Sequence, residues 1–289
     1  MSVRPSTRTP SDDRTGKVHA VKTPSNQQDA DAALARSEAY GFLATALGYP
    51  DRDLADMDAS PDRWSAWKHA LQRSFPTSAE RLNRIRADLP ESSDDDRMTA
   101  LKNVHTDLFG HAVRGRCPPY ELEYIRSDIP QRASELADIA GFYEAFGMRM
   151  DARAKERSDH AVPECEFMGV LAAREAYAIE NENEEARQIL SNAQRAFLTD
   201  HLGRWLPALS TRLEEADPEG FYGKVGTFAR EFIGDDCHRL GAVCGPEFLE
   251  LSLADPRRDA EIQCGVEESC PGSTPQGSES LVQLRIDRG

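Results

Sequence analysis

The sequence is poor in lysine and in aromatic residues, and this lack narrows the classes of partner. Its 289 residues include six lysines, and Phe, Trp and Tyr together make up 7%. Asp and Glu outnumber Lys and Arg by 50 to 35, which gives a net charge of -15. Such an acidic chain repels phosphates, so we expect no nucleic-acid partner. It suits a basic partner such as an arginine-rich peptide, although a general bias of the host's proteins explains the charge equally well.

Long apolar runs are missing as well. No stretch of eighteen apolar residues occurs, so we expect no membrane insertion. The first 28 residues carry basic side chains but lack the apolar segment of a secretory signal. The sequence therefore predicts a cytoplasmic protein.

Sequence signatures of catalysis and metal binding are also absent. There is no Gly-rich phosphate loop and no Cys-x-x-Cys pair. The six cysteines are expected to be free thiols, and we expect no catalytic residue, no metal and no cofactor. Four of them come late in the chain, at Cys237, Cys244, Cys264 and Cys270. The segment 235–238 with Cys244 comes nearest to a metal-ligand set, but no histidine has the glutamate three residues before it that a helical-bundle metal site uses.

Apolar residues recur at helical spacing through most of the chain. Leu34, Tyr40, Leu43 and Leu47 form the first such stripe, in a helix expected to start near Asp29. Further helices are predicted within residues 64–75, 81–89, 98–109, 136–146, 162–178, 184–198, 197–213 and 221–232. Alternation with period two is confined to residues 281–286. The fold class predicted is therefore all-α, a globular multi-helix fold.

The composition also suggests how the chain is divided. Residues 1–28 are rich in Ser, Thr and Pro and predict a disordered N-terminal tail. Residues 29–250 are expected to form one helical domain, and 251–289 a flexible, Cys-containing C-terminal tail. Within the domain, the charged segment 149–158 carries no apolar stripe and is interpreted as a possible hinge. The chain is accordingly expected to be a monomer or a homodimer that swaps halves through this hinge.

Two short stretches stand out as a candidate binding surface, 117–124 (CPPYELEY) and 158–168 (SDHAVPECEFM). A proline deep in a helix costs about 3 kcal/mol, so the second stretch should start its helix near Val162 or Pro163. The Pro-Pro pair predicts a stiff loop that presents Tyr120 and Glu121 at the surface. If the loop continues as a helical turn, Tyr120 and Tyr124 share a face.

We interpret these stretches as a peptide-binding site, with carboxylates for a basic segment and aromatic or Met side chains for an apolar one. The candidate residues are Tyr120, Glu121, Tyr124, Asp159, His160, Glu164, Phe167 and Met168. Structural alternatives remain open for several of them. Phe167 and Met168 fit a helix core, His160 fits a cap, and Glu164 fits a favourable first-turn charge. His201 and Trp205 are interpreted as structural.

The order of these motifs resembles the TorD/DmsD/NarJ family, the chaperones that assemble molybdenum-cofactor oxidoreductases. The resemblance covers residues 34–233 and rests on Leu108-Phe109, Cys117 to Tyr124, Ile139 to Tyr143, Phe146-Gly147, Asp159-His160, Glu164 to Met168, Phe197-Leu198, His201-Leu202 and Trp205. The Pro-Pro-Tyr-Glu loop is similar to the subgroup that serves dimethylsulfide dehydrogenase, selenate reductase and related nitrate reductases. Ser158, Pro163 and Cys165 depart from the family pattern.

The resemblance implies an all-helical chaperone that acts in the cytoplasm. It would bind the catalytic, molybdenum-binding subunit of a DMSO-reductase-type oxidoreductase, through its twin-arginine leader or another part. It would delay export or membrane attachment until the cofactor is inserted. Two other interpretations of the residues stay open: a helical adaptor without an assembly role, and a metal-binding helical protein.

Overall fold

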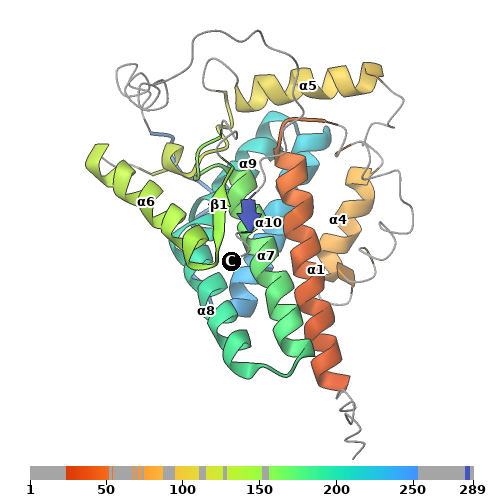
Figure 1. Ribbon diagram of the computed structural model, residues 1–289. Coiled ribbons are helices and arrows are strands. Elements are labelled where there is room, and N and C mark those ends of the chain that lie inside the picture. Colours follow the sequence, from red (N-terminus) through yellow and green to blue (C-terminus); the bar gives the residue numbers. More distant parts are fainter. Residues whose placement is uncertain are drawn as a thin grey trace, which may run out of the picture.

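In the computed structural model the chain forms a helical fold (Figure 1), and the predicted all-α class is confirmed. The structure describes residues 24–51, 54, 68, 71–72, 75–86, 95–110, 115–125, 129–151, 156–252 and 284–286. The α-helices of this part are α1 (Pro24–Leu47), α4 (Pro76–Arg86), α5 (Asp95–Phe109), α6 (Ile129–Ala145), α7 (Ala161–Glu180), α8 (Glu184–Asp200), α9 (Leu202–Ala216) and α10 (Phe221–Leu240). None of them is both long enough and apolar enough to cross a membrane.

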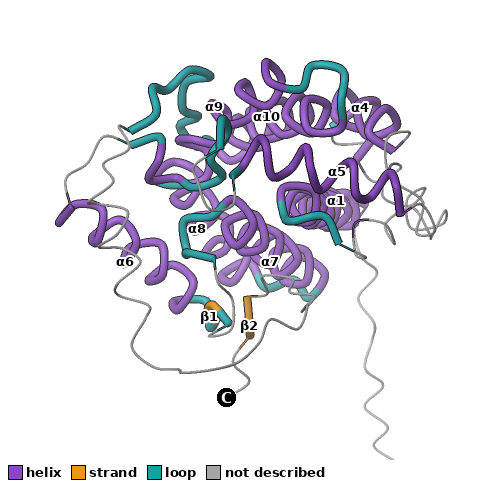
Figure 2. The backbone as a smooth tube through the Cα atoms, turned by 90° about the horizontal axis from the view of Figure 1, so that it is seen from above, coloured by secondary structure: helices purple, strands orange, loops and turns teal. Residues whose placement is uncertain are grey.

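Helix α7 runs through the middle of the fold. It lies alongside α1, with α8, α9 and α10 packed around the two, and α6 lies at the edge (Figure 2). Most side chains of α7 are buried because the helix is apolar nearly all round, which is typical of a central helix. At Gly169 the two long helices come close. A Cβ at this position would lie 3.4 Å from the Ser37 carbonyl oxygen and 3.5 Å from Tyr40 Cβ.

Helix boundaries differ from the predicted ones by up to eight residues, the largest difference being at the end of α10. α1 begins at Pro24, where a first-turn proline is well tolerated, so residues 24–28 belong to the helix rather than to the predicted tail. α4 starts five residues before the predicted segment 81–89 and ends at Arg86. Most of the predicted segment 64–75, including both of its tryptophans, lies outside the described residues, as do residues 1–23 and 253–283 of the predicted tails.

A buried polar cluster joins four helices through one arginine. The Arg36 side chain on α1 is fully buried and donates to Asp236 Oδ1 on α10 at 2.5 Å. It also donates to Glu175 on α7 at 2.8 Å and to Gln194 on α8 at 2.6 Å. Burial alone would raise the pKa of Asp236, but the Arg36 charge and hydrogen bond lower it. This cluster was not predicted from the sequence.

A two-stranded sheet occupies the start of the predicted hinge. β1 (Met148–Met150) follows α6 after Gly147, whose φ of +68° favours glycine, and pairs antiparallel with β2 (Leu284–Ile286). The register places Met148 opposite Ile286. β2 lies within the segment 281–286 that showed period-two alternation. Residues 152–155 of the hinge lie outside the described part of the chain.

Helix α9 contains a proline whose position leaves a carbonyl free. Pro207 has no N–H, so the hydrogen bond that would normally join it to the Gly203 carbonyl four residues earlier is missing. The Gly245 amide, from the segment after α10, donates to that carbonyl at 2.9 Å. The proline is therefore accommodated, and the segment after α10 is attached to the start of α9.

Candidate functional site

The structure brings the two stretches singled out in the sequence side by side. Tyr120 is extended, with φ of -123° and ψ of 131°, and pairs with His160 in an isolated antiparallel bridge. The Glu121 amide donates to the Asp159 carbonyl at 2.8 Å, and the Ala161 amide donates to the Pro119 carbonyl at 2.9 Å. The loop before the short 3-10 helix η1 (Glu121–Glu123) is thus fixed to the start of α7.

Asp159 is fully buried at this junction. Arg157 donates to both of its carboxylate oxygens, from Nε at 2.9 Å and from Nη2 at 2.5 Å. The Leu122 amide donates to Asp159 Oδ2 at 3.2 Å. Asp159 therefore holds η1 in place from beneath.

His160 caps α7. Its Nδ1 accepts a hydrogen bond of 3.1 Å from the Val162 amide, so this nitrogen must carry a lone pair. Burial lowers the pKa of His160, which keeps the ring neutral as the cap requires. The helix begins at Ala161, one or two residues before the predicted start. Pro163 is tolerated there because first-turn amides have no partner within the helix.

The loop is not helical at Tyr120, so the condition under which the two tyrosines would share a face is not met, and they lie in different surroundings. Tyr120 precedes the short η1 turn, and its hydroxyl donates to Glu156 Oε2 at 2.6 Å. The Arg157 guanidinium lies 4.7 Å from the Tyr120 ring centroid. Tyr124 is buried, with its ring 5.3 Å from that of Trp205.

Glu121 is fully buried, so the prediction that the loop presents it at the surface is wrong. η1 turns the side chain under α9. There one carboxylate oxygen lies 3.2 Å from His201 Nδ1, and the other accepts from Arg204 Nη2 at 2.9 Å. Because both carboxylate oxygens have a partner, one of them the Arg204 cation, burial of the carboxylate is possible.

His201 and Arg204 connect this buried carboxylate to the surface of α6. His201 Nε2 lies 3.2 Å from Asp138 Oδ2, and Arg204 also donates to Glu135 at 3.2 Å. Burial alone would lower the pKa of His201, but its hydrogen bond to Glu121 and the nearby carboxylates raise it. Arg204 was missed in the sequence, where its only signal was its place between His201 and Trp205.

Glu164 lies next to Glu121 and is also fully buried. Trp205 Nε1 donates to its Oε2 at 3.0 Å. Burial raises the pKa of Glu164 well above its usual value, and the Glu121 charge raises it further. Glu164 is therefore a neutral acid. Its Oε1 has no hydrogen-bond partner among the described residues.

Phe167 and Met168 lie in the core, in agreement with the structural alternative. The Phe167 ring centroid lies 4.7 Å from that of Phe197 and 5.1 Å from that of Tyr143. Seven of the eight candidate residues are buried, and only Tyr120 is partly exposed. The exposed border of the site consists of carboxylates that were not predicted, Glu135 and Asp138 on α6 and Glu156 before α7, which we call the acidic rim.

One group of side chains has the spacing of metal ligands. Glu121, Glu135 and His201 offer ligand atoms that all lie within 4.8 Å of one another. Arg204 donates to both carboxylates and already supplies positive charge there. Within the described part of the chain, the segment 235–238 and Cys244 do not form such a group.

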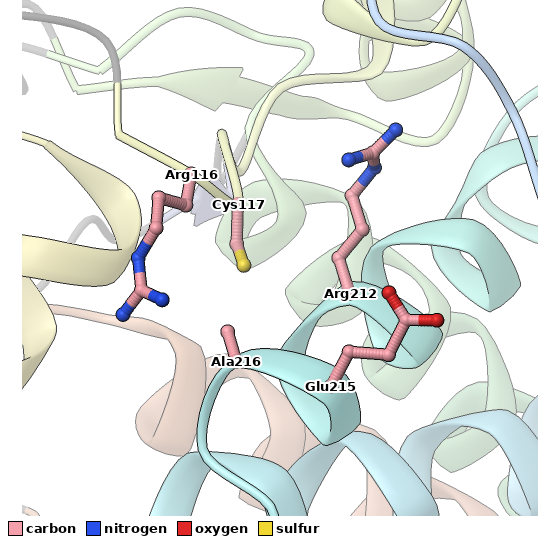
Figure 3. A pocket seen from close by; sticks show the side chains of 5 residues that line it. All are labelled: Arg116, Cys117, Arg212, Glu215 and Ala216. Carbon is pink, nitrogen blue, oxygen red and sulfur yellow. The ribbon is translucent and has the colours of Figure 1, made fainter.

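A polar pocket of about 230 Å³ lies at Cys117 (Figure 3). Arg116, Arg212 and Glu215 line it, and the Cys117 thiol points into it between the loop and the end of α9. Burial raises the pKa of Cys117 to about 11, so its sulfur stays protonated at neutral pH. This thiol is therefore a weak nucleophile.

Comparison of the sequence with known proteins finds similarity to assembly chaperones. Residues 68–211 match the family described as nitrate reductase delta subunit. The chain is 31% identical to the perchlorate reductase assembly chaperone protein of Dechloromonas aromatica, over 72% of this chain and 90% of the relative. It is 27% identical to chaperone protein TorD of Vibrio cholerae, over 71% of this chain and 91% of the relative.

A shorter match reaches a third kind of assembly chaperone. The chain is 32% identical to the selenate reductase assembly chaperone protein of Thauera selenatis, over 40% of this chain and 58% of the relative. No solved structure matches this fold. With its all-helical fold and its match to nearly the whole length of the perchlorate reductase chaperone, the chain belongs to the TorD/DmsD/NarJ family of assembly chaperones.

Proposed function

We propose that this protein is a cytoplasmic, system-specific chaperone that binds the catalytic subunit of a molybdenum-cofactor oxidoreductase before that subunit is exported or attached to a membrane. The observation that carries the proposal is the 31% identity over 90% of the perchlorate reductase assembly chaperone. The proposed role is binding rather than catalysis. The carboxylates of Glu121, Asp159 and Glu164 are engaged in hydrogen bonds with other protein groups, which gives them a structural role.

The acidic rim is the proposed contact for the basic head of a twin-arginine leader. Asp138 is the most exposed of its carboxylates, with 64% of the side chain accessible, and Glu156 follows with 34%. Carboxylates bind guanidinium groups through charge-assisted hydrogen bonds. The Tyr120 ring already makes a cation–π contact with the Arg157 guanidinium. An arginine of the leader would bind the ring by the same kind of interaction.

The buried candidate residues have a positioning role in this proposal. Glu121, Asp159, His160 and Glu164 fix η1 and the start of α7, and Phe167 and Met168 pack beneath them. Tyr124 supports the loop against Trp205. Together they hold Tyr120 and the acidic rim in place. A dissociation constant of about 1 μM, or roughly -8 kcal/mol, would allow release once the client is complete.

The test is calorimetric titration of the full-length protein with a synthetic leader peptide from a molybdenum oxidoreductase of the same host. Asp138→Ala, combined with Glu156→Gln, should weaken binding by about tenfold, since two charge contacts are lost. Glu185→Ala removes a carboxylate on the exposed face of α8 and is the matched control. Equal affinities for all three proteins would contradict the proposed contact surface.

The adaptor alternative makes a different prediction about the client. An adaptor recognises a folded partner, whereas the proposed chaperone binds an isolated peptide or an incomplete subunit. Comparing binding of the cofactor-free and cofactor-loaded catalytic subunit distinguishes the two. Whether the chain acts as a monomer or as a domain-swapped homodimer stays a prediction.

A further inference from the structure

The segment 241–245, which we call the strap, is held in a fixed position after α10. Gly241 ends the helix in the left-handed region, with φ of +66°. Its amide donates to the His238 carbonyl at 3.3 Å, and the Ala242 amide donates to the Cys237 carbonyl at 2.8 Å. This pair of bonds is the Schellman ending of a helix, and it turns the chain back over the last turn of α10.

The rest of the strap is fixed to the junction of α8 and α9. The Val243 amide donates to Thr199 Oγ1 at 3.2 Å, and the Gly245 amide donates to the Gly203 carbonyl that Pro207 leaves free. A side chain at Gly245 would meet the backbone of Arg204, so the strap lies directly against the helix that carries the Glu121 partners. Both neighbours of Cys244 are therefore held by hydrogen bonds.

This backbone places two thiols beside the same glycine, one buried and one exposed. Cys237 lies in the core on the last turns of α10, and a Cβ at Gly203 would lie 3.0 Å from its Sγ. Cys244 is exposed on the strap, and its neighbour Gly245 is bonded to the same Gly203 that Cys237 Sγ lies against. Both cysteines therefore lie at Gly203, one on each of the two segments that the Schellman ending brings together, which is the arrangement that a disulfide between them requires.

We propose that Cys237 and Cys244 form a redox-active dithiol that closes to an intramolecular disulfide when a peroxide oxidises the exposed sulfur. In the first step the Cys244 thiolate attacks one peroxide oxygen of hydrogen peroxide, the O–O bond breaks, and sulfenic acid and hydroxide form. In the second step the Cys237 sulfur attacks the sulfenic sulfur, and water leaves as the S–S bond forms. Two thiols and one peroxide give one disulfide and two waters.

The roles of the two sulfurs follow from their surroundings. The interaction with the neighbouring Cys237 thiol lowers the pKa of Cys244 to about 7, so a large share of this exposed thiol is thiolate at neutral pH. The same interaction and burial raise the pKa of Cys237, which keeps its proton and is shielded from solvent. Cys244 is thus the attacking sulfur and Cys237 the resolving one.

The test is peptide mapping of the full-length protein after treatment with hydrogen peroxide and alkylation of the remaining thiols. The expected result is a Cys237–Cys244 linkage that dithiothreitol reverses, while buried Cys117 and Cys165 stay reduced. A variant with both Cys264→Ser and Cys270→Ser should give the same linkage. Failure of this test would leave the proposed chaperone function untouched, because no client is involved.

Two single variants test the order of the steps. In Cys237→Ser, which replaces a buried sulfur by a hydroxyl of similar size, Cys244 should stop at sulfenic acid and be labelled by dimedone. In Cys244→Ser, Cys237 should stay reduced under the same treatment. The proposal is overturned if wild-type Cys244 is oxidised without linkage to Cys237, or if Cys237 is oxidised at the same rate in Cys244→Ser.

Discussion

The indole nitrogen of Trp205 donates a hydrogen bond of 3.0 Å to the carboxyl group of Glu164, directly beside buried Glu121. Two adjacent carboxyl groups in the core cannot both be ionised at low cost. Glu121 has His201 and Arg204 as partners, whereas burial and the neighbouring Glu121 raise the pKa of Glu164 well above its usual value. The site therefore depends on a neutral acid.

Glu164→Gln should stabilise the fold more at alkaline than at acidic pH. The pKa of Glu164 is higher in the folded than in the unfolded state. The protonated side chain therefore contributes its full stability below the unfolded-state pKa, and this contribution is lost as the pH rises through the folded-state pKa. Glutamine keeps both the acceptor for Trp205 and a donor for Glu121. We expect a gain on the order of 1 kcal/mol at about pH 8 and almost none at about pH 4, measured by urea denaturation. A gain that does not change with pH would show that Glu164 is ionised in the folded protein.

Arg36→Met should be strongly destabilising. It leaves Asp236 and Glu175 buried without their main cation, a loss that typically costs about 3–5 kcal/mol. Arg187→Met is the matched control, because this partly exposed arginine also links α8 to α1, through Asp29. It should cost less than about 1 kcal/mol. Similar losses for the two variants in chemical denaturation would argue against the central role of the Arg36 cluster.

His160→Ala should remove the N-cap of α7. Loss of a cap costs about 1 kcal/mol, and it removes the edge contact with Tyr120 as well. Asparagine caps helices well, so His160→Asn should recover most of the loss. Thermal unfolding of both variants measures the difference. If His160→Asn is no more stable than His160→Ala, the cap contributes little.

Glu121→Lys should impair folding, because Glu121 is not at the surface. The substitution places a lysine in a fully buried position beside His201 and Arg204. Glu121→Gln should be milder, since it removes the charge and retains an acceptor for Arg204. Circular dichroism and the yield of soluble protein separate the two. A well-folded Glu121→Lys protein would contradict the packing around η1.

The sequence predicted the helices well because apolar stripes at helical spacing report burial directly, as Tyr40, Leu43 and Leu47 do on α1. It also singled out both halves of the site. It could not predict the burial of Glu121 or Arg36, since a charged residue is expected at the surface until its partners are known. Those partners lie 80 residues away for His201 and 200 for Asp236. For the same reason the acidic rim, formed partly by α6, was not foreseen.

The continuation of α9 through Pro207 could not be predicted from the sequence either. Pro207 is expected to break a helix, yet α9 continues through it because Gly245 takes up the carbonyl that the proline leaves unpaired. Such compensation by a segment about 40 residues later cannot be read from local sequence.

The most direct test of the chaperone role is affinity capture with the tagged full-length protein from the cytosol of its own host, grown under conditions that induce molybdenum oxidoreductases. Mass spectrometry then identifies the bound proteins, and the variant Asp138→Ala with Glu156→Gln serves as the comparison. We predict that one molybdenum-binding catalytic subunit dominates with the wild-type protein and is depleted with the variant. Capture of folded, unrelated proteins without any such subunit would contradict the proposed function.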